Sequence, residues 1–100
     1  MTDIVSQLKS LPFTLKVEQD TDGVFVQIKE FSPGYEEQAT LDETLKALAR
    51  SLKEWGKILG AEFEEWRKWH KEEVPALLKI LVSSEDELLE CLRNSRPENI

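Results

Sequence analysis

His70 is the only histidine of the chain and the residue best suited to proton transfer or metal binding. A metal site built on it would need carboxylates such as Glu62 or Glu73, because the sequence offers no second histidine. As a general base it would need a nucleophile or an orienting carboxylate placed by the fold. A lone histidine in a tryptophan-rich amphipathic segment is more often a partly buried structural side chain. We therefore expect no metal and no catalytic residue, with a small enzymatic or ligand-binding domain using His70 and nearby carboxylates as the alternative.

The other residues that could carry out chemistry do not form a recognisable site. Asp20 and Asp22 are a potential carboxylate pair, but they lie in a tight loop where Asp is favoured because it bonds its own backbone. Cys91 is the only cysteine, which rules out an intrachain disulfide and a cysteine-based metal cluster and favours a reducing compartment. The sequence has no Gly-rich phosphate loop and no nucleophile elbow. We expect a protein without a cofactor that is not an enzyme.

Aromatic side chains concentrate between residues 55 and 69. They could form a platform on which bases stack, but the acidic residues among them argue against contact with nucleic acid. Burial in the core or a protein interface is the better interpretation. Trp69 lies toward the edge of the apolar stripe, so we expect it to be exposed and to anchor a protein contact.

The charge of the chain favours a basic protein as its partner. The 100 residues include 13 basic and 20 acidic side chains, which gives a formal net charge of −7. Affinity for phosphates comes mainly from Lys and Arg, so no direct binding to nucleic acid is expected. The segment from Met1 to Val5 does not resemble a signal peptide, and no apolar run approaches the ~20 residues of a membrane span. We expect a soluble, cytoplasmic protein that does not bind membranes.

Two segments with strand periodicity follow a short N-terminal helix-like stretch that ends before Pro12. Apolar and polar residues alternate from Phe13 to Glu18 and again from Val24 to Lys29, which predicts two half-buried strands. The loop between them ends at Gly23 and has the chemistry of a hairpin connection. After a Pro-Gly turn, the charged stretch from Tyr35 to Ala39 predicts a short strand at the edge of the sheet.

The main helix has a clear start signal at Thr40, with Glu43 completing a capping box. Apolar residues at helical spacing predict one continuous buried face: Leu41, Leu45, Leu48, Leu52, Trp55 and Leu59. The sequence leaves two alternatives at Gly60. Either a separate helix runs from Ala61 to about Glu73, which we favour, or Gly56 and Gly60 are close-packing points in a longer helix.

Two more helices are predicted toward the C-terminus. Pro75 suits the first turn of a short apolar helix from Val74 to Leu81, and Ser84 with Glu87 forms a second capping box. The expected fold class is α+β, with a small antiparallel three-stranded sheet packed against one main helix and followed by two or three C-terminal helices. We expect a single domain over residues 1–100, with a β-β-β-α unit at 13–55, a helical extension at 56–93 and a frayed tail at 94–100.

The segment from Phe13 to Leu52 resembles the HicB-like antitoxin domain. The similarity rests on the strand pattern, the Asp22-Gly23 hairpin, the Pro33-Gly34 turn, Gln38 in the third strand, and a helix opening Thr-Leu-x-Glu at Thr40 with Leu45 and Leu48 following. It implies a degraded RNase H-like unit without catalysis, which neutralises a small basic RNA-cleaving HicA toxin. This chain departs from the family pattern in a shorter segment before Thr40 and in the absence of a recognisable DNA-binding module.

The resemblance makes a non-enzymatic binding protein the leading interpretation. It implies a basic, toxin-like ribonuclease as partner and is compatible with a homodimer. The partner-binding residues that we expect are the acidic groups near the third strand and the start of the main helix, together with two aromatic anchors: Tyr35, Glu36, Glu37, Asp42, Glu43 and Trp69.

Overall fold

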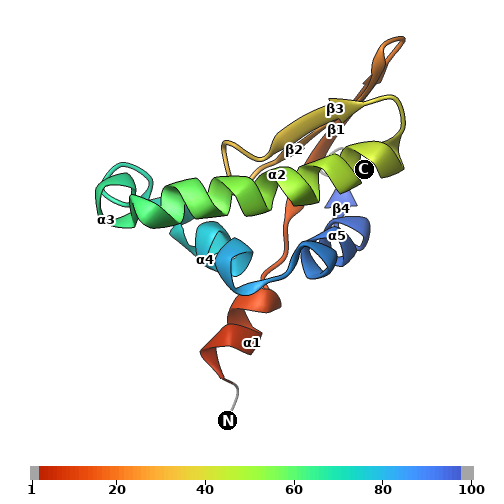
Figure 1. Cartoon of the computed structure of the whole chain (residues 1–100). Coiled ribbons are helices and arrows are strands. Elements are labelled where there is room, and N and C mark those ends of the chain that lie inside the picture. The colour runs from red at the N-terminus through yellow and green to blue at the C-terminus, as the bar shows by residue number, and fades with distance from the viewer. Residues whose placement is uncertain (1–2, 98–100) are drawn as a thin grey trace.

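The computed structural model of the chain describes residues 3–97, and it confirms an α+β fold in which a main helix follows a small sheet (Figure 1). Our expectations for the first two residues and for the last three lie outside this range. The elements in chain order are α1 Ile4–Lys9, β1 Thr14–Asp20, β2 Gly23–Ile28, β3 Tyr35–Gln38, α2 Leu41–Ala61, α3 Phe63–Trp66, the 3-10 helix η1 Lys71–Glu73, α4 Val74–Val82, α5 Glu85–Arg93 and β4 Arg96–Pro97.

The sheet is built on the predicted hairpin. Its strand order is β3-β2-β1-β4, and β1 pairs antiparallel with β2 from Leu15 opposite Ile28 to Asp20 opposite Gly23. The Asp20 carboxylate accepts hydrogen bonds from the backbone N–H groups of Asp22 (2.7 Å) and Gly23 (3.1 Å), which closes the turn. Gly23 has a φ of 154°, and a side chain there would collide with the backbone carbonyl of Gln38 in β3.

The main helix α2 forms a layer between the sheet and the α4–α5 pair (Figure 1). Val26, Ile28, Leu48 and Leu52 are fully buried in the core between them. The predicted buried face is wrong at two positions, because Leu41 is 46% exposed and Trp55 is 37% exposed. Covered on two sides, α2 instead buries smaller neighbours of the leucine stripe: Thr44, Ala49 and Gly56.

Close contacts hold α4 against α2. A Cβ on Gly56 would lie 3.0 Å from Cγ2 of Ile80, so the two helices approach as near as glycine allows. The ammonium of Lys53 donates to the carbonyl oxygens of Ile80 (3.0 Å) and Ser83 (2.6 Å) at the end of α4. These carbonyls lack helical partners, so Lys53 caps α4 from the neighbouring helix.

The helix end near Gly60 is confirmed, but the segment that follows is not the helix we expected. Helix α2 stops at Ala61, and α3 covers only Phe63–Trp66 before a turn leads into η1. The prediction of one helix from Ala61 to Glu73 is therefore wrong. The Glu73 carboxylate accepts hydrogen bonds from the backbone N–H (2.7 Å) and hydroxyl (2.6 Å) of Ser32, which ties η1 to the loop after β2.

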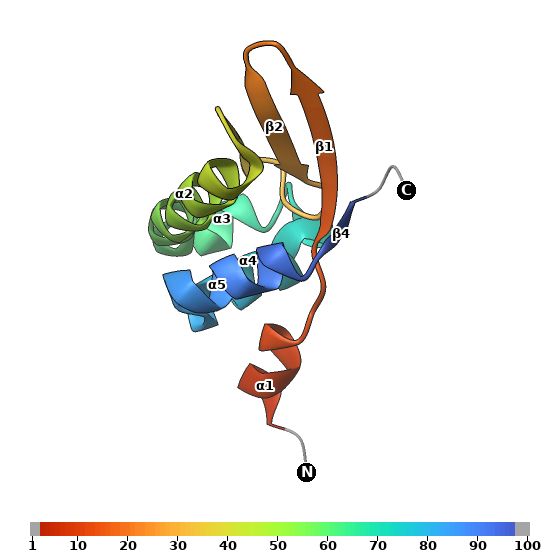
Figure 2. The same cartoon turned by 90° about the vertical axis from the view of Figure 1, so that its right-hand side faces the viewer.

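The C-terminal part follows the predicted caps and adds one strand. Pro75 lies in the first turn of α4, and Ser84 and Glu87 form the full capping box of α5. Arg96 and Pro97 then run parallel to β1 as β4, a pairing that the sequence pattern did not indicate for the tail. Helix α1 projects beyond α4 and α5 (Figure 2). Within residues 3–97, none of the helices is long and apolar enough to cross a bilayer.

Candidate functional site

Strand β3 forms one edge of the sheet and brings three of the predicted binding residues together. It pairs on one side with β2, where Gln27 lies opposite Tyr35 and Val26 opposite Glu36. On its other side no strand of residues 3–97 pairs with it. The short, charged edge strand that the sequence predicted is therefore confirmed in position, and it ends one residue earlier than expected, at Gln38.

A buried hydroxyl sets the position of β3 relative to α2. Thr44 Oγ1 accepts a hydrogen bond from the backbone N–H of Gln38 (3.0 Å) and lies 2.8 Å from the carbonyl oxygen of Val24. Thr44 is completely buried and lies in the first turns of α2, so one side chain joins β2, β3 and the helix. The cap of the same helix is Thr40, whose hydroxyl accepts from the Glu43 N–H (3.2 Å), as the sequence predicted. The predicted capping box is only half formed, because the Glu43 carboxylate accepts from the Thr40 hydroxyl (3.1 Å) and not from its backbone N–H.

A hollow of about 310 Å³ lies beside β3 and reaches across to α2. Aromatic and acidic side chains share its wall. The rings of Phe25 and Tyr35 lie 6.2 Å apart on neighbouring strands, and Tyr35 is 55% exposed. The residues that line the hollow are Phe25, Pro33, Tyr35, Glu36, Glu37, Ser51 and Trp55.

The acidic residues of the predicted site differ in whether they form ion pairs within the protein. No described residue forms an ion pair with Glu36 or Glu37. Asp42, in contrast, lies 3.1 Å from the Lys46 ammonium and 3.0 Å from the Arg93 guanidinium. The bond to Lys46 and then the bond to Arg93 lower the pKa of Asp42 below its ordinary value. Two uncompensated carboxylates therefore lie beside the hollow, while Asp42 is engaged within the molecule.

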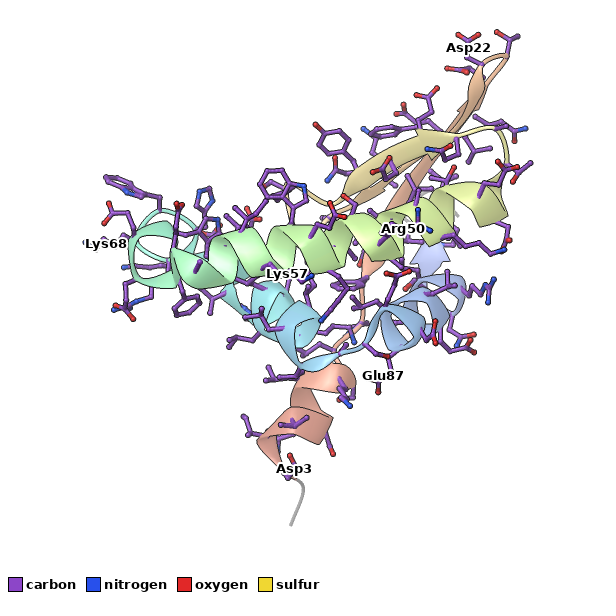
Figure 3. All side chains as sticks on the ribbon, viewed as in Figure 1. Asp3, Asp22, Arg50, Lys57, Lys68 and Glu87 are labelled. Carbon is purple, nitrogen blue, oxygen red and sulfur yellow. The ribbon has the colours of Figure 1, made fainter. Side chains whose placement is uncertain are left out.

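The six predicted binding residues do not form one surface. Tyr35, Glu36 and Glu37 line the hollow, whereas Asp42 and Glu43 lie in the first turn of α2. Trp69 is 79% exposed, as expected, but it lies in the turn after α3, beyond the other end of a 21-residue helix. Its neighbour Lys68 marks that end in Figure 3, far from Asp22 at the hairpin tip. Because an α-helix of this length spans about 30 Å, Trp69 belongs to a different face from the start of α2.

His70 contacts one aromatic ring and one carboxylate. Its ring stacks on Trp66 with centroids 5.1 Å apart, and its Nδ1 lies 3.7 Å from a Glu73 carboxylate oxygen. Both oxygens of that carboxylate already accept hydrogen bonds from Ser32. Among residues 3–97 there is no group of three or more side chains that could hold a metal ion. The alternative function based on His70 requires nearby carboxylates. The carboxylate beside the imidazole is that of Glu73, which binds Ser32.

A larger hollow of about 740 Å³ lies between α1, α4 and α5 and includes the buried side chain of Lys79. The Lys79 ammonium donates to the carbonyl oxygen of Lys9 at the end of α1 and lies 5.4 Å from the centre of the Phe13 ring. Lys9 also forms an ion pair with Glu87 at 2.9 Å. These contacts fasten α1 to the helical layer, so we assign Lys79 a structural role.

Comparison with known proteins identifies a shared fold. No protein-family model matches the sequence, and no curated protein matches it. Among solved structures, the fold is similar to that of the antitoxin part of an inferred toxin/antitoxin system from Syntrophomonas wolfei subsp. wolfei, with a TM-score of 0.76 and 22% sequence identity. The match covers 87% of this chain and 64% of that protein, so this chain spans less than two thirds of its length.

Proposed function

We propose that this chain is an antitoxin of the HicB type, a non-enzymatic protein that binds and neutralises a small basic RNA-cleaving toxin. The observation that carries the proposal is the open acidic edge at β3, where Glu36 and Glu37 lack ion-pair partners among the described residues and border an aromatic hollow. The likeness in fold to a protein described as an antitoxin supports the same role.

The chemistry of this edge favours a cationic protein partner. Two uncompensated carboxylates speed association with a basic surface and disfavour acidic partners. Exposed aromatic side chains beside them, here Tyr35 and Trp55, supply the apolar contact that affinity requires. A ribonuclease must carry basic groups to hold its RNA substrate, so this edge would compete with RNA for the same surface of the toxin.

The enzymatic alternative has less support from the geometry. It requires His70 to act with nearby carboxylates, yet Glu73 bonds Ser32 and the imidazole stacks on Trp66. A binding role needs no such arrangement.

Affinity capture from the native host tests the proposal. The tagged chain should recover a small basic protein that cleaves RNA in vitro and loses that activity when the chain is added. Recovery of the chain alone, as a monomer or homodimer at physiological salt, would contradict the proposed function.

A further inference from the structure

The open edge of β3 presents backbone groups as well as side chains. The Ile28 N–H donates to the Gly34 carbonyl at 2.7 Å, and hydrogen-bonded pairs alternate along an antiparallel ladder. Counting along the strand from Gly34, Glu36 is the next hydrogen-bonded position, so its backbone groups point toward β2. The backbone groups of Glu37, at the position between, point away from β2. The Glu37 N–H and C=O therefore lie on the outer edge, without a hydrogen-bond partner among the described residues.

A second copy of this chain is a poor occupant of that edge. Antiparallel pairing of β3 with itself would place Glu37 opposite Glu37 in one register and Glu36 opposite Glu36 in the other, so each register brings two identical carboxylates together. Like charges directly opposite one another destabilise a strand pair. A strand that carries basic residues would instead neutralise both glutamates.

The hollow beside β3 has the size and walls of a receptor for one long cationic side chain. Its volume of about 310 Å³ lies at the lower limit of small-molecule sites, which span roughly 300–1,000 Å³. The side chains of Tyr35, Glu36 and Trp55 line the hollow, and aromatic rings and a carboxylate both attract a guanidinium. Arginine suits such a site better than lysine because its planar group stacks and pairs bidentately.

We propose that the partner adds a strand to the outer edge of β3, with its backbone bonded to Glu37 and an arginine side chain in the hollow. The partner segment is therefore extended and basic, with the arginine flanked by residues that favour strands. Main-chain hydrogen bonds supply affinity in this mode, and the pocket for the side chain supplies specificity. The identification of this segment as part of a toxin rests on the proposed function, whereas the strand-addition site does not.

A peptide titration followed by NMR tests the site without a purified toxin. The probe is a blocked heptapeptide of alternating Thr and Val with a central Arg, added to the isotope-labelled chain at up to about 5 mM because a short strand binds weakly. We expect saturable shifts confined to residues 35–38 and the Trp55 indole, with slower hydrogen exchange at the Glu37 amide. Replacing Arg by citrulline, which keeps the shape and removes the charge, should weaken binding about fivefold or more.

A pair of variants separates the backbone contact from the charge. Glu37→Ala and Glu37→Pro both remove the carboxylate, but only proline removes the outward N–H, and proline is tolerated on an edge strand. We expect the proline variant to bind the peptide distinctly more weakly than the alanine variant, with the rest of the amide spectrum unchanged in both. Equal binding by the two variants, equal binding of the citrulline peptide, shifts outside the β3 edge, or no saturable binding would each overturn the inference. If the peptide does not bind but the captured toxin is still neutralised, the strand-addition site is wrong and the proposed antitoxin function stands, because the toxin then binds another surface.

Discussion

The hydroxyl of Thr44 lies 3.0 Å from the backbone nitrogen of Gln38 and replaces a backbone hydrogen bond between β2 and β3. Val24 lies opposite Gln38, yet the Gln38 N–H bonds to Thr44 Oγ1, which is also 2.8 Å from the Val24 carbonyl. A side chain of α2 thus completes the ladder at the end of the sheet. This buried contact joins the pairing with β2 in holding the proposed binding edge in position.

Removing that hydroxyl should destabilise the fold and loosen β3. Thr44→Val keeps the shape but leaves the N–H of Gln38 without its acceptor, so we expect a loss of about 1–3 kcal/mol in the free energy of unfolding. Thr44→Ser keeps the hydroxyl and should lose distinctly less. Urea denaturation measures both values, and equal losses for the two variants would show that the hydroxyl has no structural role.

The two glycines of α2 should respond differently to alanine. A Cβ on Gly60 would lie 3.3 Å from a methyl carbon of Leu81, which is 41% exposed and free to move, so Gly60→Ala should stabilise the helix by up to about 1 kcal/mol. A Cβ on Gly56 would meet Ile80, which is completely buried, so Gly56→Ala should destabilise the protein by about 1 kcal/mol. Thermal unfolding gives the order, and a more stable Gly56→Ala variant would contradict the packing described for α4.

Acid should weaken the attachment of α5 and α1. The Ser84 backbone N–H and then the Lys9 ammonium lower the pKa of Glu87 below its ordinary value of 4.5. A carboxyl whose pKa is lower in the folded state contributes stability above about pH 4.5, and this contribution is lost as the pH falls through the folded pKa. We expect Glu87→Gln to lower Tm at pH 7 and to reduce the fall in Tm between neutral and acidic pH. A Tm profile parallel to that of the wild type would refute this assignment.

Neutralising the edge carboxylates should leave the fold intact. Glu36 and Glu37 make no ion pairs with described residues, so the double change to Gln should alter the free energy of unfolding by no more than about 0.5 kcal/mol. The same change at Glu64 and Glu65, which pair with Arg67 and Lys68 at 2.9 and 3.2 Å, alters the net charge equally and serves as a control. A large loss of stability at Glu36 and Glu37 would mean that these carboxylates hold β3 in place.

Local patterns were sufficient to predict most elements of this fold. The hairpin, the edge strand, the Thr40 and Ser84 caps and the position of Pro75 follow from signals within a few residues of each other. Trp55 lies on the predicted apolar stripe and yet lines the hollow, because exposure depends on how far the edge strand extends over the helix. No periodicity in the sequence contains that information.

The candidate site was only partly predictable for the same reason. Asp42 appeared free in the sequence, but it pairs with Arg93, 51 positions away. Phe25 interrupts an otherwise polar strand face, and that irregularity was the one local signal of the hollow. Trp69 was correctly expected to be exposed, although its distance from β3 required the length of α2.

Growth rescue by co-expression is the most direct test of the proposed antitoxin function. The protein captured from the native host is expressed in a bacterial strain with or without this chain, and growth is measured after induction. The account predicts that the captured protein arrests growth, that this chain and its Glu64→Gln/Glu65→Gln variant restore it, and that the equally stable Glu36→Gln/Glu37→Gln variant restores it much less. A captured protein that does not affect growth, or full rescue by the Glu36→Gln/Glu37→Gln variant, would contradict the account.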